Sequence, residues 1–355
     1  MTITAPVTRS RVLTAMSGGV DSSVSALLLR EAGFDVVGVF MRNGVTASPA
    51  AAEKSCCSAS DARDAAGTAD CLGIPFYAID YAAEFGALID HFAAEYRRGR
   101  TPNPCVLCNQ HLKFGHLFTL ADSVGAETVA TGHYADVRDG KLYRAHDAAK
   151  DQTYYLFGVD RDALARVQFP LGRLTKAEVR ARARAAGLAA AEKPESMEIC
   201  FVTSGDYRDV VRTRGGVGQA GCFVDVNGAR LGEHDGVAGF TVGQRRGLPA
   251  LGTPHYVREI RPATGEVVLV ERDGLLDDVA VARGVNWLVD TPGRAGVDAQ
   301  VKIRARSDAV PARVVPSADD DSVRIEFARP VAAVTPGQAA VFYDGDLVLG
   351  GGWLD

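Results

Sequence analysis

The sequence predicts an α/β protein, with a parallel sheet in its first part and two smaller β-rich parts after it. Strand-like and helix-like runs alternate over the first 135 residues, which is typical of a parallel sheet with helices on both faces. A glycine turn joins the first strand to the first helix, as in a Rossmann-like sheet. After about residue 205, glycines become frequent and short alternating runs replace the helical patterns. This change favours antiparallel β barrels or sandwiches.

The elements of the first part follow in order. Strands are predicted over residues 11–16, 35–40, 75–80 and 127–134, and helices over 20–31, 58–72, 84–98 and 109–123. Residues 134–145 have a strand–Asp-Gly–strand hairpin pattern. Residues 153–186 have a helical pattern, and their last part contains a capping box of Thr175 and Glu178 with Gly187 at its end.

The later part contains short strands separated by turn residues, and a break near residue 280 divides them. We therefore predict a catalytic nucleotide-binding domain over 1–205, a small β-rich middle domain over 206–280 and a C-terminal β-barrel domain over 281–355.

Composition limits the class of protein. Of the 355 residues, 47 % are hydrophobic and 23 % charged, which is ordinary for a globular enzyme. No apolar run reaches the roughly 18 residues of a membrane span, and the N-terminus has no apolar region of signal-peptide length. We therefore expect a cytoplasmic protein with no membrane partner, whose seven cysteines are reduced, catalytic or metal-binding. The net charge of −5 argues against a generic nucleic-acid binder, but local basic clusters occur at 96–100 and 161–184.

The glycine turn, "SGGVDSS" at residues 17–23, has the features of an anion site. Gly18 and Gly19 let the backbone approach an anion, and three serine hydroxyls and the N-terminus of the next helix add donors. It is not a Walker A loop, because no lysine follows the glycines. A lysine-free turn followed by Asp21 suits the binding of pyrophosphate as a leaving group while AMP moves to an acceptor.

Three cysteines stand in polar loops. Cys105 and Cys108 lie in "TPNPCVLCNQ", and Cys200 lies in "ESMEICFV". Asn109 is expected to cap a helix, which would put Cys108 at a helix N-terminus where the dipole favours thiolate. Cys71 and Cys222 fit small core residues.

Several cysteine chemistries can be compared with this spacing. A structural zinc site needs four ligands, and a thioredoxin-like pair needs a different context, so neither is favoured. Two hypotheses remain. Cys105, Cys108 and Cys200 could hold an iron–sulfur cluster with one iron open for sulfur, or two cysteines could transfer sulfur, one as a persulfide and the other as its resolving thiol.

Eight motifs together resemble the tRNA-specific 2-thiouridylases of the PP-loop ATP pyrophosphatase superfamily, and they extend over nearly the whole chain. They are "AMSGGVDSS", "PNPCVLCN", "ATGHY", "KDQTYYLF", "ESMEICFV", "TVGQRRGL", "VKIRAR" and "PGQAAVFYDGD". The resemblance implies a PP-loop domain and an ATP-dependent sulfurtransferase. Such an enzyme adenylates the 2-carbonyl oxygen of a wobble uridine and replaces that oxygen with sulfur from a protein persulfide. The wobble base must leave its stack to reach such a pocket.

The resemblance also implies roles for individual residues. Cys200 carries the persulfide and Cys108 is the second catalytic cysteine. ATP contacts fall on Ala15, Met16, Ser17, Gly18, Gly19, Val20, Asp21, Ser22, Met41 and Gly132. Contacts with tRNA fall on the target-base loop Asn103, Pro104 and Cys105, and on His133, Lys150, Asp151, Gln152, Arg304, Ala305 and Gln338. Many members carry Asp where this chain has Cys105, which puts a carboxylate role there in doubt.

The implied cofactors are ATP and Mg²⁺, with no resident metal in the protein. The implied partners are the tRNAs for Lys, Glu and Gln, which have a wobble uridine, and a persulfide donor such as a cysteine desulfurase. Turnover can end in a Cys108–Cys200 disulfide, which a reductant must reopen. Two alternatives stay open: an amidating PP-loop synthetase that uses ammonia and needs neither cysteine, and a non-catalytic RNA-binding protein with a vestigial nucleotide site.

Overall fold

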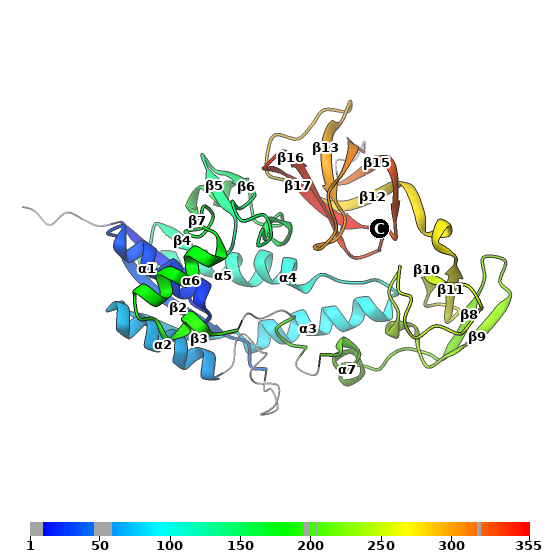
Figure 1. Ribbon diagram of the computed structural model, residues 1–355, viewed down its shortest axis with the longest axis horizontal. Coiled ribbons are helices and arrows are strands. Elements are labelled where there is room, and N and C mark those ends of the chain that lie inside the picture. Colours follow the sequence, from blue (N-terminus) through cyan, green and yellow to red (C-terminus); the bar gives the residue numbers. More distant parts are fainter. Residues whose placement is uncertain (1–9, 46–58, 195–198, 203–204, 318–320) are drawn as a thin grey trace, which may run out of the picture. The chain divides into compact units, whose positions relative to one another are not determined.

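The computed structural model describes residues 10–45, 59–194, 199–202, 205–317 and 321–355 (Figure 1). The chain divides into two compact units. The first contains Met1–Gly86, Cys108–Thr153 and Val159–Thr203, and the second contains Ala87–Leu107, Tyr154–Gly158 and Ser204–Asp355. Each unit is described by itself.

The first unit contains a five-stranded sheet in the order β3-β2-β1-β4-β7, and every neighbouring pair is parallel. The strands are β1 (Arg11–Ala15), β2 (Asp35–Arg42), β3 (Phe76–Asp80), β4 (Thr128–Ala130) and β7 (Val167–Gln168). This order confirms the predicted Rossmann-like sheet. Ligand sites in such sheets lie at the carboxyl ends of the strands.

Helices pack on both faces of this sheet, as predicted. On one face, α1 (Val20–Glu31), α2 (Ala59–Leu72) and α6 (Lys176–Ala185) share a core that includes Val24, Ala65 and Val179. On the other face, Leu117 and Ala121 of α5 (Gly115–Ser123) pack against β-strand side chains. The helix α3 (Ala82–Arg97) follows β3. Ser58, the first residue of the predicted second helix, lies outside the described residues.

The helix expected from residue 109 begins earlier. It starts at Pro104 with α4 (Pro104–Leu107), continues as a π-helix over Cys108–Phe114, and then becomes α5. Proline is favoured in the first helical turn, where its missing N–H costs nothing. The prediction that Asn109 caps the helix and places Cys108 at its N-terminus was therefore wrong.

The helical pattern over residues 153–186 was also predicted too long. The segment contains 3₁₀ turns at Thr153–Tyr155 and Asp162–Arg166, then β7, then α6. Pro170 and Gly172 interrupt it, and a Cβ on Gly172 would meet the Ala135 carbonyl oxygen at 2.1 Å. The capping box of Thr175 and Glu178 on α6 is confirmed.

Two smaller predictions have mixed outcomes. The hairpin is confirmed as β5 (Asp136–Arg138) and β6 (Lys141–Tyr143), and positive φ at Asp139 and Gly140 fits its tight turn. Cys71, expected in the core, is exposed on α2.

The second unit contains α7 (Tyr207–Thr213) and two sheets. The smaller sheet has the order β10-β11-β8-β9. Its strands are β8 (Gly221–Val224), β9 (Arg230–His234), β10 (Tyr256–Arg261) and β11 (Glu266–Val270). The β11–β8 pair is parallel, so this sheet is not purely antiparallel.

The C-terminal strands form a closed barrel in the order β12-β15-β14-β13-β16-β17, because β12 also pairs with β17. They are β12 (Leu276–Trp287), β13 (Val297–Lys302), β14 (Val310–Pro316), β15 (Ser322–Ala332), β16 (Ala339–Asp344) and β17 (Leu347–Leu354). This pairing joins the first and last of the six strands to each other. In the part of the chain that is described, no helix is both long and apolar enough to cross a membrane.

Candidate active site

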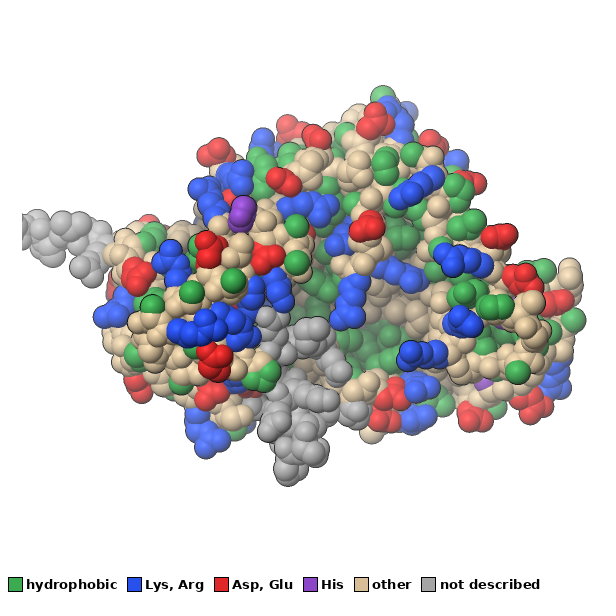
Figure 2. Space-filling view, in the orientation of Figure 1, with side chains coloured by type: hydrophobic (Ala, Val, Ile, Leu, Met, Phe, Trp, Pro, Cys, Tyr) green, Lys and Arg blue, Asp and Glu red, His purple; other side chains and the backbone are tan. Residues whose placement is uncertain are grey.

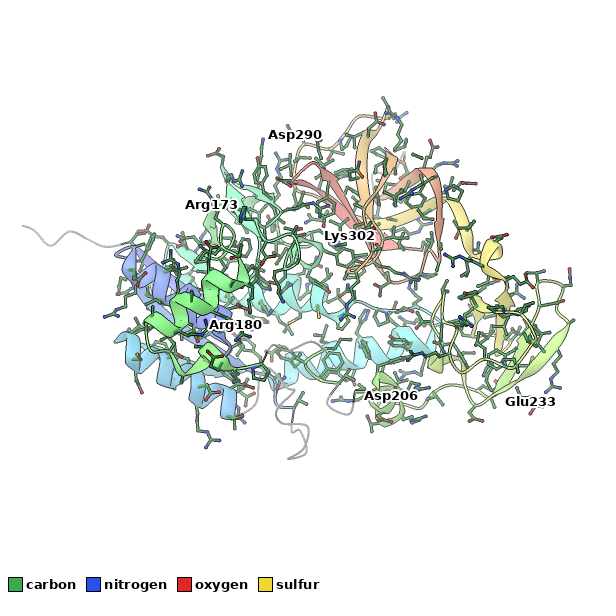
Figure 3. All side chains as sticks on the ribbon, in the orientation of Figure 1. Arg173, Arg180, Asp206, Glu233, Asp290 and Lys302 are labelled. Atoms are coloured by element: carbon green, nitrogen blue, oxygen red, sulfur yellow. The ribbon has the colours of Figure 1, made fainter. Side chains whose placement is uncertain are left out.

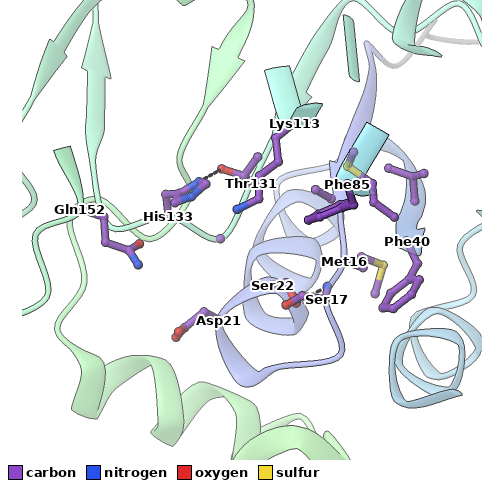
Figure 4. A pocket seen from close by; sticks show the side chains of 14 residues that line it. Met16, Ser17, Asp21, Ser22, Phe40, Phe85, Lys113, Thr131, His133 and Gln152 are labelled. Atoms are coloured by element: carbon purple, nitrogen blue, oxygen red, sulfur yellow. Dashed lines mark hydrogen bonds between the residues drawn. The ribbon is translucent and has the colours of Figure 1, made fainter. Parts of the chain in front are cut away.

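A pocket of about 230 Å³ lies at the carboxyl ends of β1, β2 and β4 (Figure 4). Seven of the ten residues predicted to contact ATP line it: Ala15, Met16, Ser17, Asp21, Ser22, Met41 and Gly132. Gly18, Gly19 and Val20 belong to the same turn, and His133 and Gln152, predicted for tRNA, also line the pocket. The other lining residues are Val39, Phe40, Phe85, Lys113 and Thr131.

Hydrogen bonds made by its own serines stabilise the glycine turn. The Ser17 backbone N–H donates to the Ser22 hydroxyl oxygen at 3.0 Å, and Ser22 donates to the Gly19 carbonyl at 3.1 Å. Gly19 occupies the N-cap of α1 without a side-chain cap. The first turn of a helix has N–H groups that need partners, and a bound anion can satisfy them.

Two glycines permit close backbone approaches around this turn. Gly18 has φ of 74°, and a Cβ there would lie 2.3 Å from the Asp61 carbonyl oxygen. A Cβ on Gly132 would lie 2.8 Å from the Ser22 nitrogen. The turn therefore fits tightly between α2 and the loop after β4, which leaves its inner side for a ligand.

A lysine from a distant part of the chain pairs with the aspartate of the turn. The Lys176 Nζ donates to both Asp21 carboxylate oxygens, at 2.7 and 2.8 Å. The Tyr134 hydroxyl donates to Asp21 Oδ1 at 2.9 Å. The Lys176 side chain is only 12 % exposed. The turn has no lysine of its own in sequence, but the fold supplies one.

A second lysine holds the outer side of the turn. The Lys193 Nζ donates to the Gly18 carbonyl at 3.2 Å, and to carboxylates of Asp61 and Asp64 at 2.6 Å each. Burial lowers the pKa of Lys193, but the hydrogen bonds to the two carboxylates outweigh this and raise it. Arg180 of α6, labelled in Figure 3, donates to the Lys193 backbone carbonyl at 3.2 Å.

Sequence reasoning missed both lysines. Their partners are 155 and 175 residues away along the chain, so no local pattern connects them. The one available signal was the capping box, which fixes Lys176 at the start of α6.

The remaining polar wall of the pocket contains Thr131, His133 and Lys113 (Figure 4). The Thr131 hydroxyl and His133 Nδ1 lie 2.7 Å apart. Desolvation lowers the pKa of His133, and the nearby positive charge of Lys113 lowers it further. His133 is therefore neutral at physiological pH.

The two predicted catalytic cysteines both belong to the first unit. Cys108 is buried and begins the π-helix, and Cys200 is half-buried in a turn. Cys105, in the second unit, is half-buried on α4. Over the described residues, no group of three or more His, Cys, Asp or Glu side chains is placed to hold a metal ion.

Comparisons with known proteins identify the family of this chain. Residues 10–204 match a family described as tRNA methyl transferase HUP domain, residues 208–271 its PRC-barrel domain, and residues 278–354 an aminomethyltransferase β-barrel domain. The chain is 47 % identical to "tRNA-specific 2-thiouridylase MnmA" of Geotalea uraniireducens, over 98 % of this chain and 95 % of that protein. It is 46 % identical to the protein of the same name from Carboxydothermus hydrogenoformans, over 98 % of both chains.

The chain belongs to the tRNA-specific 2-thiouridylase family. This confirms the resemblance that the eight motifs indicated. The family's implied tRNA contacts are placed as follows.

The target-base loop is largely buried within the second unit. Asn103 and Pro104 are buried, and the Asn103 side chain hydrogen-bonds to Tyr154, whose hydroxyl donates to the Ala339 carbonyl at 2.9 Å. Gln338 donates from Nε2 to the Thr101 carbonyl at 2.9 Å. In this structure Gln338 therefore supports the start of the loop from the barrel side.

Arg304 also makes contacts inside the second unit. One of its terminal nitrogens donates to the carbonyls of Val242 and Ala333 and to the Thr335 hydroxyl, at 2.7–3.0 Å. Burial lowers the pKa of Arg304. This nitrogen links the segment between β9 and β10 to the loop after β15, and Ala305, next to Arg304 in sequence, is half-buried.

Lys150, Asp151 and Gln152 follow the hairpin in the first unit. The Asp151 carboxylate accepts hydrogen bonds from the Ala145 backbone and the Thr153 hydroxyl. The Gln152 side-chain oxygen accepts from the Tyr134 backbone N–H at 2.9 Å, beside the pocket. Lys150 is half-buried. Asp151 and Gln152 thus fix the loop that borders the pocket.

Proposed function

We propose that this protein is an ATP-dependent tRNA sulfurtransferase that converts the wobble uridine to 2-thiouridine. One observation carries the proposal: the helical segment that begins with Cys108 also lines the nucleotide pocket through Lys113. A sulfur-handling cysteine and an adenylation site then share one structural element. The relatives named tRNA-specific 2-thiouridylase support the same chemistry.

In the first step, the protein holds ATP across the pocket. Met16, Phe40, Met41 and Phe85 provide the apolar end for adenine. The glycine turn binds the β- and γ-phosphates through backbone N–H groups and hydroxyls. The uridine O2 attacks the α-phosphorus, the Pα–O–Pβ bond breaks, and pyrophosphate leaves. Mg²⁺ prefers oxygen ligands, which the Asp21 carboxylate and the serine hydroxyls of the turn would supply. Bound Mg²⁺ would neutralise phosphate charge.

In the second step, sulfur replaces the activated oxygen. Cys200 carries a persulfide, and the Cys108 thiolate attacks the Cys200 Sγ. The S–S bond of the persulfide breaks, and the terminal sulfur leaves as hydrosulfide. Hydrosulfide attacks C2, the C2–O bond breaks, and AMP leaves. Cys108 and Cys200 are oxidised to a disulfide, and an external thiol reduces it.

The partners follow from this chemistry. We propose that tRNAs for Lys, Glu and Gln are the acceptors, that a cysteine desulfurase loads Cys200, and that the reaction takes place in the cytoplasm. Basic side chains gather over α6 in Figure 2 and offer a phosphate-binding face on the first unit. We further propose that residues 1–205 form the catalytic domain, that residues 206–280 form a middle domain, and that the barrel domain at 281–355 adds a second surface for tRNA.

The test is nucleoside mass spectrometry of tRNA incubated with the protein, ATP and a persulfide donor. We expect 2-thiouridine and one AMP per thiolation. Cys200→Ser should release pyrophosphate and adenylate the tRNA but form no 2-thiouridine, and Cys108→Ser should also adenylate the tRNA and accumulate persulfide on Cys200. The matched control is Cys71→Ser, since Cys71 is exposed on α2 away from the pocket. Thiolation by the Cys200→Ser protein would contradict the proposal.

Substitutions of Cys105 distinguish persulfide transfer from an iron–sulfur mechanism. With persulfide transfer, Cys105→Asp restores the residue of many relatives and should keep most activity. With a cluster on Cys105, Cys108 and Cys200, Cys105→Ala should lose iron and activity together. Activity that tracks iron in anaerobically purified protein would replace the persulfide step. An ammonia-dependent product without sulfur would instead identify an amidating synthetase.

A further inference from the structure

Few charged side chains line the nucleotide pocket, although its proposed ligand, ATP, is a polyanion. Of the 14 residues that line it, Lys113 is the one lysine or arginine, and Asp21 is the one carboxylate. His133 contributes no positive charge, because desolvation and Lys113 lower its pKa. The cation within the pocket wall itself is therefore Lys113, while Lys176 is paired with Asp21 at the edge.

The π-helix determines where this lysine lies. Cys108 and Lys113 are five residues apart, at the first and sixth positions of the π-helix. In a regular α-helix, five residues turn the chain by about 500°, which places their side chains about 140° apart. The i→i+5 hydrogen bonds of a π-helix take five residues through about one turn instead. Lys113 and Cys108 are thus brought toward the same side of the helix. Such π segments are frequent at functional sites.

We propose that Lys113 is a catalytic residue that binds the α-phosphate, in the adenylation step and again when AMP leaves. This inference rests on the proposed function. In Figure 4 the Lys113 side chain lies beside Thr131, on the opposite side of the pocket from Asp21. With the β- and γ-phosphates at the glycine turn and adenine at the apolar end, the α-phosphate lies between them, within the region that Lys113 faces.

The proposed reaction is favoured by a positive charge beside the α-phosphate. When the uridine O2 attacks, negative charge builds on the α-phosphate oxygens. When the C2–O bond breaks, the electron pair and its charge go to AMP. An ammonium group fixed in the pocket wall stabilises both charges more than it stabilises bound ATP. Its position on the same side of the helix as Cys108 places it close to the carbon that sulfur attacks.

The test compares three variants in single-turnover AMP formation, with saturating ATP, tRNA and a Cys200 persulfide. Lys113→Met keeps the length of the side chain and removes the charge, and we expect the rate to fall by at least about 100-fold. Lys113→Arg keeps the charge and should restore part of the rate. The matched control is Lys141→Met, because Lys141 is exposed on the β5–β6 hairpin and should leave the rate unchanged. A wild-type rate in folded Lys113→Met protein would overturn the inference.

A pH profile gives a second readout that a purely structural lysine would not change. An ammonium group loses its proton at lower pH than a guanidinium group does, so the wild-type rate should decline at alkaline pH while the Lys113→Arg rate stays on its plateau to higher pH. Identical declines in both proteins would overturn the inference, even if Lys113→Met does not fold. Failure of the wild-type protein to form AMP and 2-thiouridine would instead refute the proposed function, which separates the two results.

Discussion

Replacement of Gly132 by alanine tests whether the glycine turn must fit closely against the loop after β4. The new Cβ would lie 2.8 Å from the Ser22 nitrogen and 2.9 Å from the Asp21 carbonyl carbon. Optimal contacts between such heavy atoms are about 3.5 Å or more. The loop and the start of α1 must therefore separate by roughly 0.7 Å. Both partners are backbone atoms, so no side chain can rotate away.

Two magnitudes follow from this displacement. Overpacking of this kind costs about 1–3 kcal/mol of the free energy of unfolding, which leaves the protein folded. A misplacement of about 1 Å in a catalytic site can reduce the rate by about 100-fold. Since Ser22 and Asp21 belong to the turn that holds the phosphates, we expect Gly132→Ala to slow AMP formation by about 10- to 100-fold.

The assay measures the initial rate of AMP release with tRNA present, together with thermal unfolding of the same samples. The control is Gly67→Ala, because Gly67 is exposed inside α2 and a Cβ there meets nothing within 4 Å. Alanine should stabilise that helix by about 0.5–1 kcal/mol and leave the rate unchanged. A wild-type AMP rate in Gly132→Ala protein would refute the close fit as a requirement for catalysis.

Four further results are expected. Lys176→Met removes the ion pair with Asp21, so AMP formation should fall roughly 100-fold while circular dichroism stays native; an unchanged rate would show the pair to be dispensable. Gln338→Ala loses the hydrogen bond to the Thr101 carbonyl, and KM for tRNA should rise about 2- to 10-fold with KM for ATP unchanged. Affinity for tRNA should fall by at least about tenfold between 50 and 200 mM salt, and a flat response would exclude phosphate contacts. The pKa of His133 is lowered on folding, so below about pH 6.5 the unfolded chain binds more protons and the free energy of unfolding falls. Thermal unfolding at pH 5 and 7 should show a smaller loss for His133→Gln than for wild type.

The sequence predicted the architecture because its signals were local and repeated. Alternating strands and helices required a parallel sheet, and the capping box at Thr175 and Glu178 located α6. Boundaries were less accurate where two local signals competed. Asn109 is a good cap, but Pro104 begins the helix five residues earlier, and the π-helix that follows has no sequence signature. The parallel β11–β8 pair is a long-range choice that alternating short strands do not reveal.

From the residues alone, the candidate site was predicted only where its members are neighbours in sequence. The glycine turn was placed at the carboxyl edge of the sheet from its strand–turn–helix context, whereas Met41, near the end of β2, and Gly132, after β4, followed from the family resemblance. The environment of Arg304 and Gln338 could not be predicted, since their hydrogen bonds are to backbone carbonyls of distant segments. The same limit hid the lysines that surround the turn.

Lys176 shows why a functional position can contradict local rules. It is the first residue of α6, and a cation near the positive end of a helix is disfavoured by about 0.3–1 kcal/mol. An acidic residue would stabilise this helix better when it is considered alone. The cost is offset from outside the helix: Asp21 accepts two hydrogen bonds from the ammonium group, and the Asp147 carboxylate accepts one from the Lys176 backbone N–H at 2.9 Å. A lysine in this place is explained by the aspartate it holds, so the violation of the helix rule itself marks the residue as part of the nucleotide site.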